Sequence, residues 1–118
     1  MKNLQNNFTT PEQSNRLLEL DVPADSADFY YDKDEVEIDE ITHPYILPFN
    51  RKFSNYNDMF YLPCWSVGRL IEICKICEPK KYYEQLCEEL QYSQNYCVVI
   101  ISHIIANLPI IDFSKLEE

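Results

Sequence analysis

The sequence is poor in several features, and each shortage excludes a class of protein. The 118 residues include one glycine, which excludes a glycine-rich barrel and a low-complexity segment. The longest apolar run, 97–101, falls far short of the roughly 20 residues that cross a bilayer. Residues 1–7 lack the apolar stretch of a signal peptide, so we expect a cytoplasmic protein.

Basic residues are also scarce. Lys and Arg together number 10 against 20 Asp and Glu, and the formal net charge is −10. Nucleic-acid affinity comes largely from neutralising phosphates, and anionic lipids repel the same acidic surface. We therefore expect neither nucleic acid nor a membrane as a partner. The same electrostatics favour a basic protein partner.

The chain nevertheless has the apolar content of a folded domain. Hydrophobic residues make up 46% and aromatic residues 14%, too much for a disordered chain. We expect a disordered N-terminal tail at 1–8 and a single domain at 9–118. Five cysteines without a secretion signal predict reduced thiols, mostly in or near the core. These are Cys64, Cys74, Cys77, Cys87 and Cys97.

Several segments carry the signals of helices. Thr10, Pro11 and Gln13 predict a capping box at the start of the first helix. Apolar residues from Val67 to Cys74 recur at helical spacing and predict a buried second helix. We expect three to four helices, at about 10–20, 65–77, 82–90 and 95–108. Periodicity alone does not decide whether 80–108 is all helix or contains a strand.

Two regions carry the signals of strands. The first is aromatic at 29–31 and then alternates apolar and acidic residues over 35–41, with a turn candidate at 32–34. A further apolar segment precedes the second helix. The sequence therefore predicts an α+β fold, in which a small antiparallel sheet (about 29–41 and 58–62) packs against the helices.

Three blocks of sequence resemble a known group of proteins. They are 9–28, 62–72 with its distinctive Pro-Cys-Trp-Ser-Val-Gly-Arg-Leu-Ile-Glu motif, and 112–118. The chain resembles small uncharacterised proteins of gut bacterial genomes, often found near prophages or other mobile elements. The resemblance implies that genomic context, and it implies no activity or site residue. Asp21 departs from the group, which usually has Gly where we expect a left-handed helix cap.

The acidic stretch 19–40 is the most unusual feature of the sequence. It holds ten acids against one base, a local charge of −9. Such a stretch is either a solvated face that protects a sheet edge or a docking surface for a basic partner. The candidate partner-binding residues are Asp32, Asp34, Glu35, Glu37, Asp39 and Glu40.

A thiol- or metal-dependent protein is the first alternative, with Cys64, Cys74, Cys77 and a histidine as candidates. Metal binding needs a second cysteine pair or added histidine ligands beside Cys74 and Cys77. This pair lies at the predicted end of a helix, where the dipole does not lower a thiol pKa. Core packing explains these cysteines better, and we expect no cofactor, metal or catalytic residue.

A small-ligand binding module is the second alternative, with an aromatic pocket built from Tyr30, Tyr31, Tyr61 and Trp65. Packing of Trp65 in the core is the simpler interpretation. We also expect Gly68 to allow a close approach to the second helix. The interpretation that the sequence favours is a non-enzymatic interaction or accessory protein with an acidic surface.

Overall fold

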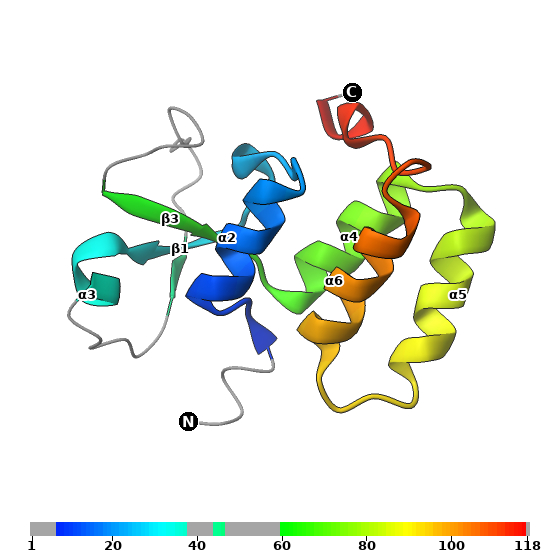
Figure 1. Ribbon diagram of the computed structural model, residues 1–118, viewed down its shortest axis with the longest axis horizontal. Coiled ribbons are helices and arrows are strands. Elements are labelled where there is room, and N and C mark those ends of the chain that lie inside the picture. The colour runs from blue at the N-terminus through cyan, green and yellow to red at the C-terminus, as the bar shows by residue number, and fades with distance from the viewer. Residues whose placement is uncertain (1–6, 38–43, 47–59, 118) are drawn as a thin grey trace.

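The structure is a computed structural model that describes residues 7–37, 44–46 and 60–117 (Figure 1). Its strands are β1 (Phe29–Asp32), β2 (Tyr45–Ile46) and β3 (Tyr61–Cys64). Its helices are α2 (Pro11–Glu19), α3 (Lys33–Glu37), α4 (Val67–Cys77), α5 (Lys80–Leu90) and α6 (Tyr96–Asn107), with 3-10 turns η1 (Ala24–Ser26) and η2 (Phe113–Glu117). The predicted α+β fold is confirmed.

The sheet is antiparallel, with β1 between β2 and β3. Successive residues of a strand point to opposite faces. Tyr31 points into the core, where it is 7% exposed and its hydroxyl donates to the Thr9 carbonyl at 2.7 Å. Tyr30 consequently points to the outer face. Helix α2 packs on β3 and lies between the sheet and the helices α4, α5 and α6 (Figure 1).

The prediction of a strand at 35–41 is wrong over its described part, because Lys33–Glu37 forms helix α3. A carboxylate oxygen of Asp32 accepts the backbone N–H of Asp34 at 2.9 Å, a local bond that favours the start of a helix. The hairpin predicted around 32–34 is therefore not formed. Strand β1 instead pairs with β2 and β3, and residues 38–41 lie outside the described residues.

The second predicted strand segment, 58–62, is displaced toward the C-terminus. Strand β3 begins at Tyr61 and continues to Cys64, so it includes Pro63, while residues 58 and 59 lie outside the described residues. Proline donates no hydrogen bond, but an edge strand needs ladder bonds on one side only. Because β3 is at the edge of this three-stranded sheet, Pro63 is tolerated there.

The predicted capping box of the first helix is confirmed. Thr10 Oγ1 accepts the Gln13 N–H at 3.1 Å, and Gln13 Oε1 accepts the Thr10 N–H at 2.9 Å. Asp21 has a φ of 69°, the left-handed conformation expected just past this helix. Helix α4 begins two residues later than predicted, because Ser66 is its cap and accepts the Arg69 N–H at 3.1 Å.

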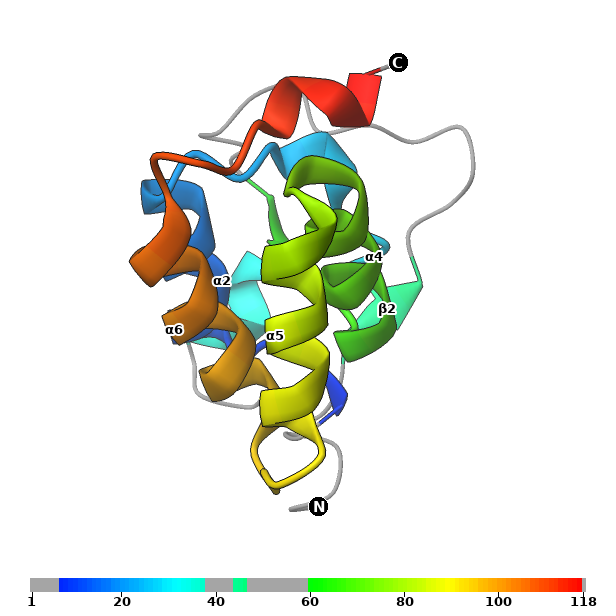
Figure 2. The same cartoon turned by 90° about the vertical axis from the view of Figure 1, so that its right-hand side faces the viewer.

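The region 80–108 forms two helices, α5 and α6, joined by a short turn. Figure 2 shows α4, α5 and α6 side by side, and all three pack against one another. The β-branched residues of α6 are accommodated because the helix buries Ile100 and Ile104 completely. Within the part of the chain that the structure describes, no helix is long and apolar enough to cross a membrane.

One cluster of buried residues joins the sheet to the helices. Trp65 is fully buried in it, as predicted, and its indole N–H donates to Ser26 Oγ at 3.0 Å. Phe8, which we assigned to the disordered tail, belongs to the fold. It bridges to Ser66 and meets Phe29 edge-to-face at 4.7 Å between ring centroids.

The predicted close approach at Gly68 is wrong. Gly68 is exposed near the start of α4, and an added Cβ would meet no atom within 4 Å. Its φ is not positive, so the backbone does not require glycine either. Close approach depends on neighbouring elements, which local sequence does not specify.

Candidate functional site

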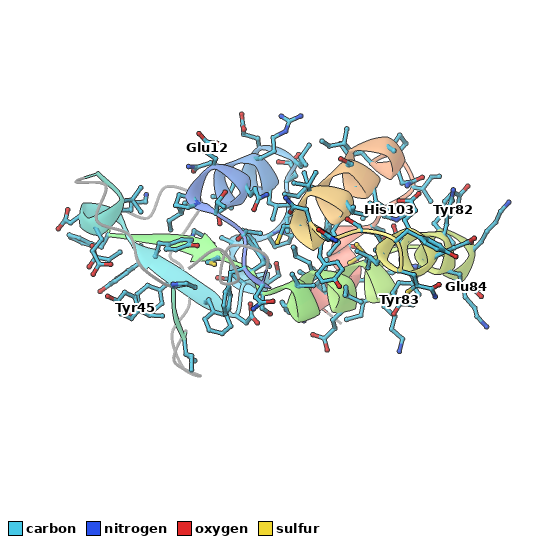
Figure 3. All side chains as sticks on the ribbon, turned by 90° about the horizontal axis from the view of Figure 1, so that it is seen from below. Glu12, Tyr45, Tyr82, Tyr83, Glu84 and His103 are labelled. Carbon is cyan, nitrogen blue, oxygen red and sulfur yellow. The ribbon has the colours of Figure 1, made fainter. Side chains whose placement is uncertain are left out.

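Three tyrosines cluster on the outer face of the sheet, one from each strand. The ring of Tyr30 lies 5.0 Å from that of Tyr61, at an interplanar angle of 83°, and 5.5 Å from that of Tyr45. The edge-to-face pair is a favoured aromatic geometry. Figure 3 places Tyr45 at the sheet end of the molecule, opposite the end where Tyr82, Tyr83 and Glu84 of α5 lie.

Acidic side chains border this cluster because α3 follows β1 directly. Asp32 alternates with Tyr31 along β1 and so shares the outer face with Tyr30. The Tyr45 hydroxyl donates to Glu35 Oε1 at 2.8 Å. That hydrogen bond to a carboxylate raises the pKa of Tyr45 above its ordinary value. We define the tyrosine–acid face as Tyr30, Tyr45, Tyr61, Asp32, Asp34 and Glu35.

Large apolar side chains are exposed beside this face. Phe60 is 65% exposed, and its ring lies 6.3 Å from that of Tyr61. Ile46, which follows Tyr45 in β2 and therefore points to the opposite face of the sheet, is 74% exposed at the sheet edge. Exposed apolar residues that adjoin a cluster of tyrosines are typical of a protein-binding surface.

The structure brings together three of the six predicted partner-binding residues. Asp32, Asp34 and Glu35 lie around the junction of β1 and α3. Glu37 is in α3, but its side chain, like Asp39 and Glu40, lies outside the described residues. Asp28 belongs to the same acidic stretch yet has an internal role, because its carboxylate accepts the N–H of Ser66 at 3.0 Å and its hydroxyl at 2.6 Å.

The aromatic residues predicted to form one pocket are divided between two faces. Tyr31 and Trp65 are buried in the core, while Tyr30 and Tyr61 lie on the outer face. Sequence reasoning missed Tyr45, which is 41% exposed and completes the cluster. Strand alternation alone would have separated Tyr30 from Tyr31. The position of Tyr45 depends on a long-range strand pair.

The candidate thiols are buried. Cys64, Cys74 and Cys77 are each at most 1% exposed. Burial disfavours the thiolate, and it raises the pKa of Cys64 to about 12, the pKa of Cys77 to about 11 and also the pKa of Cys74. The thiolate is both the nucleophile and the metal ligand, so these cysteines support neither role. No group of three or more His, Cys, Asp or Glu side chains that could hold a metal ion occurs among residues 7–37, 44–46 and 60–117.

His103 is a buried, hydrogen-bonded residue of the core. His103 Nε2 lies 2.8 and 2.9 Å from the two carboxylate oxygens of Glu78, and both residues are buried. The amide nitrogen of Asn107 donates to the His103 carbonyl at 2.9 Å and therefore also faces His103 Nδ1, at 3.4 Å. With Nδ1 as acceptor, the ring proton is on Nε2 and points at Glu78. The pair joins α4 to α6 away from the surface.

Comparisons of the chain with protein-family models, with curated proteins and with solved structures found no match. The resemblance to small proteins of gut bacteria therefore stays a prediction from the sequence.

Proposed function

We propose that this protein is a non-enzymatic interaction protein that binds a basic protein partner through the tyrosine–acid face. One observation supports this most strongly: Tyr30, Tyr45 and Tyr61 cluster beside the carboxylates of Asp32, Asp34 and Glu35 on the outer side of the sheet. The resemblance to mobile-element proteins supports an accessory role in a bacterial cytoplasm.

The chemistry of the face suits lysine and arginine side chains. Carboxylates attract them, and a tyrosine ring face attracts a cation by about 0.5–1 kcal/mol at an exposed site. Tyrosine also contributes a large contact area at low entropic cost. The net charge of −10 would accelerate encounter with a basic partner and would repel nucleic acid.

An affinity capture from bacterial lysate, analysed by mass spectrometry, tests the proposal. The tagged protein would be compared with Asp34→Asn/Glu35→Gln, which removes two charges from the face. The matched control is Glu88→Gln/Glu89→Gln, which removes two exposed charges from α5. We expect a basic protein that the wild type and the control retain and the face variant loses, with weaker capture in high salt.

Two results would contradict the proposal. The first is equal retention of the captured protein by the face variant and the control. The second is the capture of no stoichiometric partner by any of the three proteins.

A further inference from the structure

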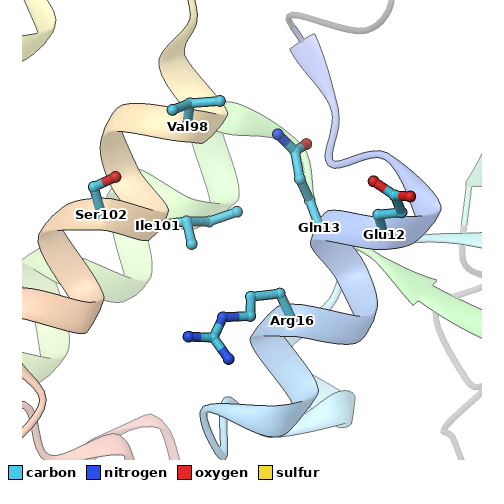
Figure 4. A pocket seen from close by; sticks show the side chains of 6 residues that line it. All are labelled: Glu12, Gln13, Arg16, Val98, Ile101 and Ser102. Atoms are coloured by element: carbon cyan, nitrogen blue, oxygen red, sulfur yellow. The ribbon is translucent and has the colours of Figure 1, made fainter.

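A groove of about 210 Å3 lies between α2 and α6 (Figure 4). Its lining comes from two short stretches of sequence. Helix α2 contributes Glu12, Gln13 and Arg16, and α6 contributes Val98, Ile101 and Ser102. The groove shares no residue with the tyrosine–acid face.

Arg16 does not form an ion pair with Glu12, the acidic residue one turn earlier in the same helix. A Glu four residues before an Arg is the favourable order for an ion pair on a helix, and Glu12 holds that position. The guanidinium of Arg16 nevertheless forms no ion pair or hydrogen bond with the described part of the chain. Figure 4 shows Arg16 extending toward α6, while the carboxylate of Glu12 lies apart from the guanidinium.

Arg69 provides the contrast. Its Nε donates to the Ser26 carbonyl at 2.6 Å, and its guanidinium pairs with Glu72 on the same helix. Arg69 is therefore used by the fold. Arg16 leaves all five of its donors available on a strongly acidic protein.

The groove offers a second donor and an apolar wall. Gln13 Oε1 is occupied by the Thr10 N–H, and Figure 4 shows the amide nitrogen of Gln13 on the side of α6. On the α6 side, Val98 is 47% exposed and Ile101 is 8% exposed. The guanidinium of Arg16 and the aliphatic side chains of Val98 and Ile101 thus line opposite sides of the groove.

We propose that this groove binds a small monocarboxylate that carries a short apolar chain. The guanidinium of Arg16 accommodates the carboxylate in a two-pronged hydrogen bond, and Gln13 donates a further one. Val98 and Ile101 cover the chain. Glu12 also borders the groove and disfavours a second negative charge, so phosphates and dicarboxylates should bind more weakly than a monocarboxylate. Pockets for drug-sized ligands measure roughly 300–1,000 Å3, so this smaller groove requires a short chain.

A titration of the isotope-labelled protein with hexanoate, followed by amide chemical shifts, tests this site. We expect saturable shifts centred on Gln13, Arg16, Ile101 and Ser102. Hexanol and hexylamine share the chain but lack the carboxylate, and we expect both to bind at least tenfold more weakly.

Variants separate the role of Arg16 from that of total charge. Arg16→Gln should weaken hexanoate binding about tenfold or more, whereas Lys81→Gln, which removes an exposed charge from α5, should leave it unchanged. The dispersion of the spectra confirms that each variant is folded. The proposal is overturned by a lack of saturable shifts with hexanoate. Equal affinities for hexanoate and hexanol, or for wild type and Arg16→Gln, would overturn it as well.

Discussion

Asp21 and Gly68 show which properties of a residue can be predicted from its neighbours in the sequence. Asp21 was predicted to be left-handed because it follows the last apolar residue of a helix and precedes Pro23 by two positions, and its φ is 69°. Gly68 was predicted to contact a neighbouring element, and it faces open space. A cap depends on the residues next to it, whereas a close approach depends on elements distant in the sequence.

The stability of Gly68→Ala tests this description of the residue. Glycine in a helix is less favourable than alanine, and here neither conformation nor space requires it. We expect the substitution to raise the free energy of unfolding by about 0.5 kcal/mol, because the position is near the helix start. Urea denaturation of both proteins measures the difference. A loss of stability would show that a neighbouring element does approach Gly68.

At the scale of elements, helix α3 shows how two sequence signals compete. Alternating apolar and acidic residues over 35–41 predicted a strand. The capping bond from Asp34 to Asp32 instead starts a helix at Lys33, directly after β1. This change matters for the candidate site, because it places Glu35 within hydrogen-bonding distance of Tyr45.

The buried pair of Glu78 and His103, which joins α4 to α6, predicts that the stability of the protein depends on pH. Burial raises the pKa of Glu78 above its ordinary value near 4.5, although the hydrogen bond from His103 opposes the shift. The folded state therefore holds this proton more tightly than the unfolded chain does. The resulting stability is complete below the pKa of the unfolded chain and is lost as pH rises through the raised pKa.

Denaturation of wild type and Glu78→Gln from about pH 4 to about pH 8 isolates this contribution. Glutamine does not titrate at this position, so the other carboxylates cancel in the comparison. We expect the stability of wild type relative to the variant to fall as pH rises. A difference that grows with pH would mean that the buried pair favours the carboxylate and would contradict the assigned direction.

At the scale of the whole molecule, the sequence predicted the fold class and the burial of Trp65, but it left open whether 80–108, which forms α5 and α6, also contains a strand. Fold class and burial can be predicted from the spacing and number of apolar residues, because a single core has to bury those residues. The structure places three of the six residues of the predicted acidic site near one another, and their role in binding a partner stays a prediction. Tyr45 and the groove beside Arg16 could not be predicted, because strand pairing and helix packing join residues far apart in the chain.

The molecule thus presents two chemically different surfaces. The tyrosine–acid face lies at the sheet end, and the groove with Arg16 lies at the junction of α2 and α6 (Figures 3 and 4). The first suits a basic macromolecule and the second a small anion. Because they share no residue, variants of one surface should leave binding at the other unchanged.

The affinity of the captured basic partner for Tyr30→Thr tests the central claim most directly. Tyr30 contacts both other tyrosines of the face, and threonine keeps the preference for a strand. The control is Tyr92→Thr, a tyrosine 85% exposed in the turn after α5. Isothermal titration calorimetry should show about tenfold weaker binding for Tyr30→Thr and no change for the control. An unchanged affinity for Tyr30→Thr would show that the partner binds elsewhere.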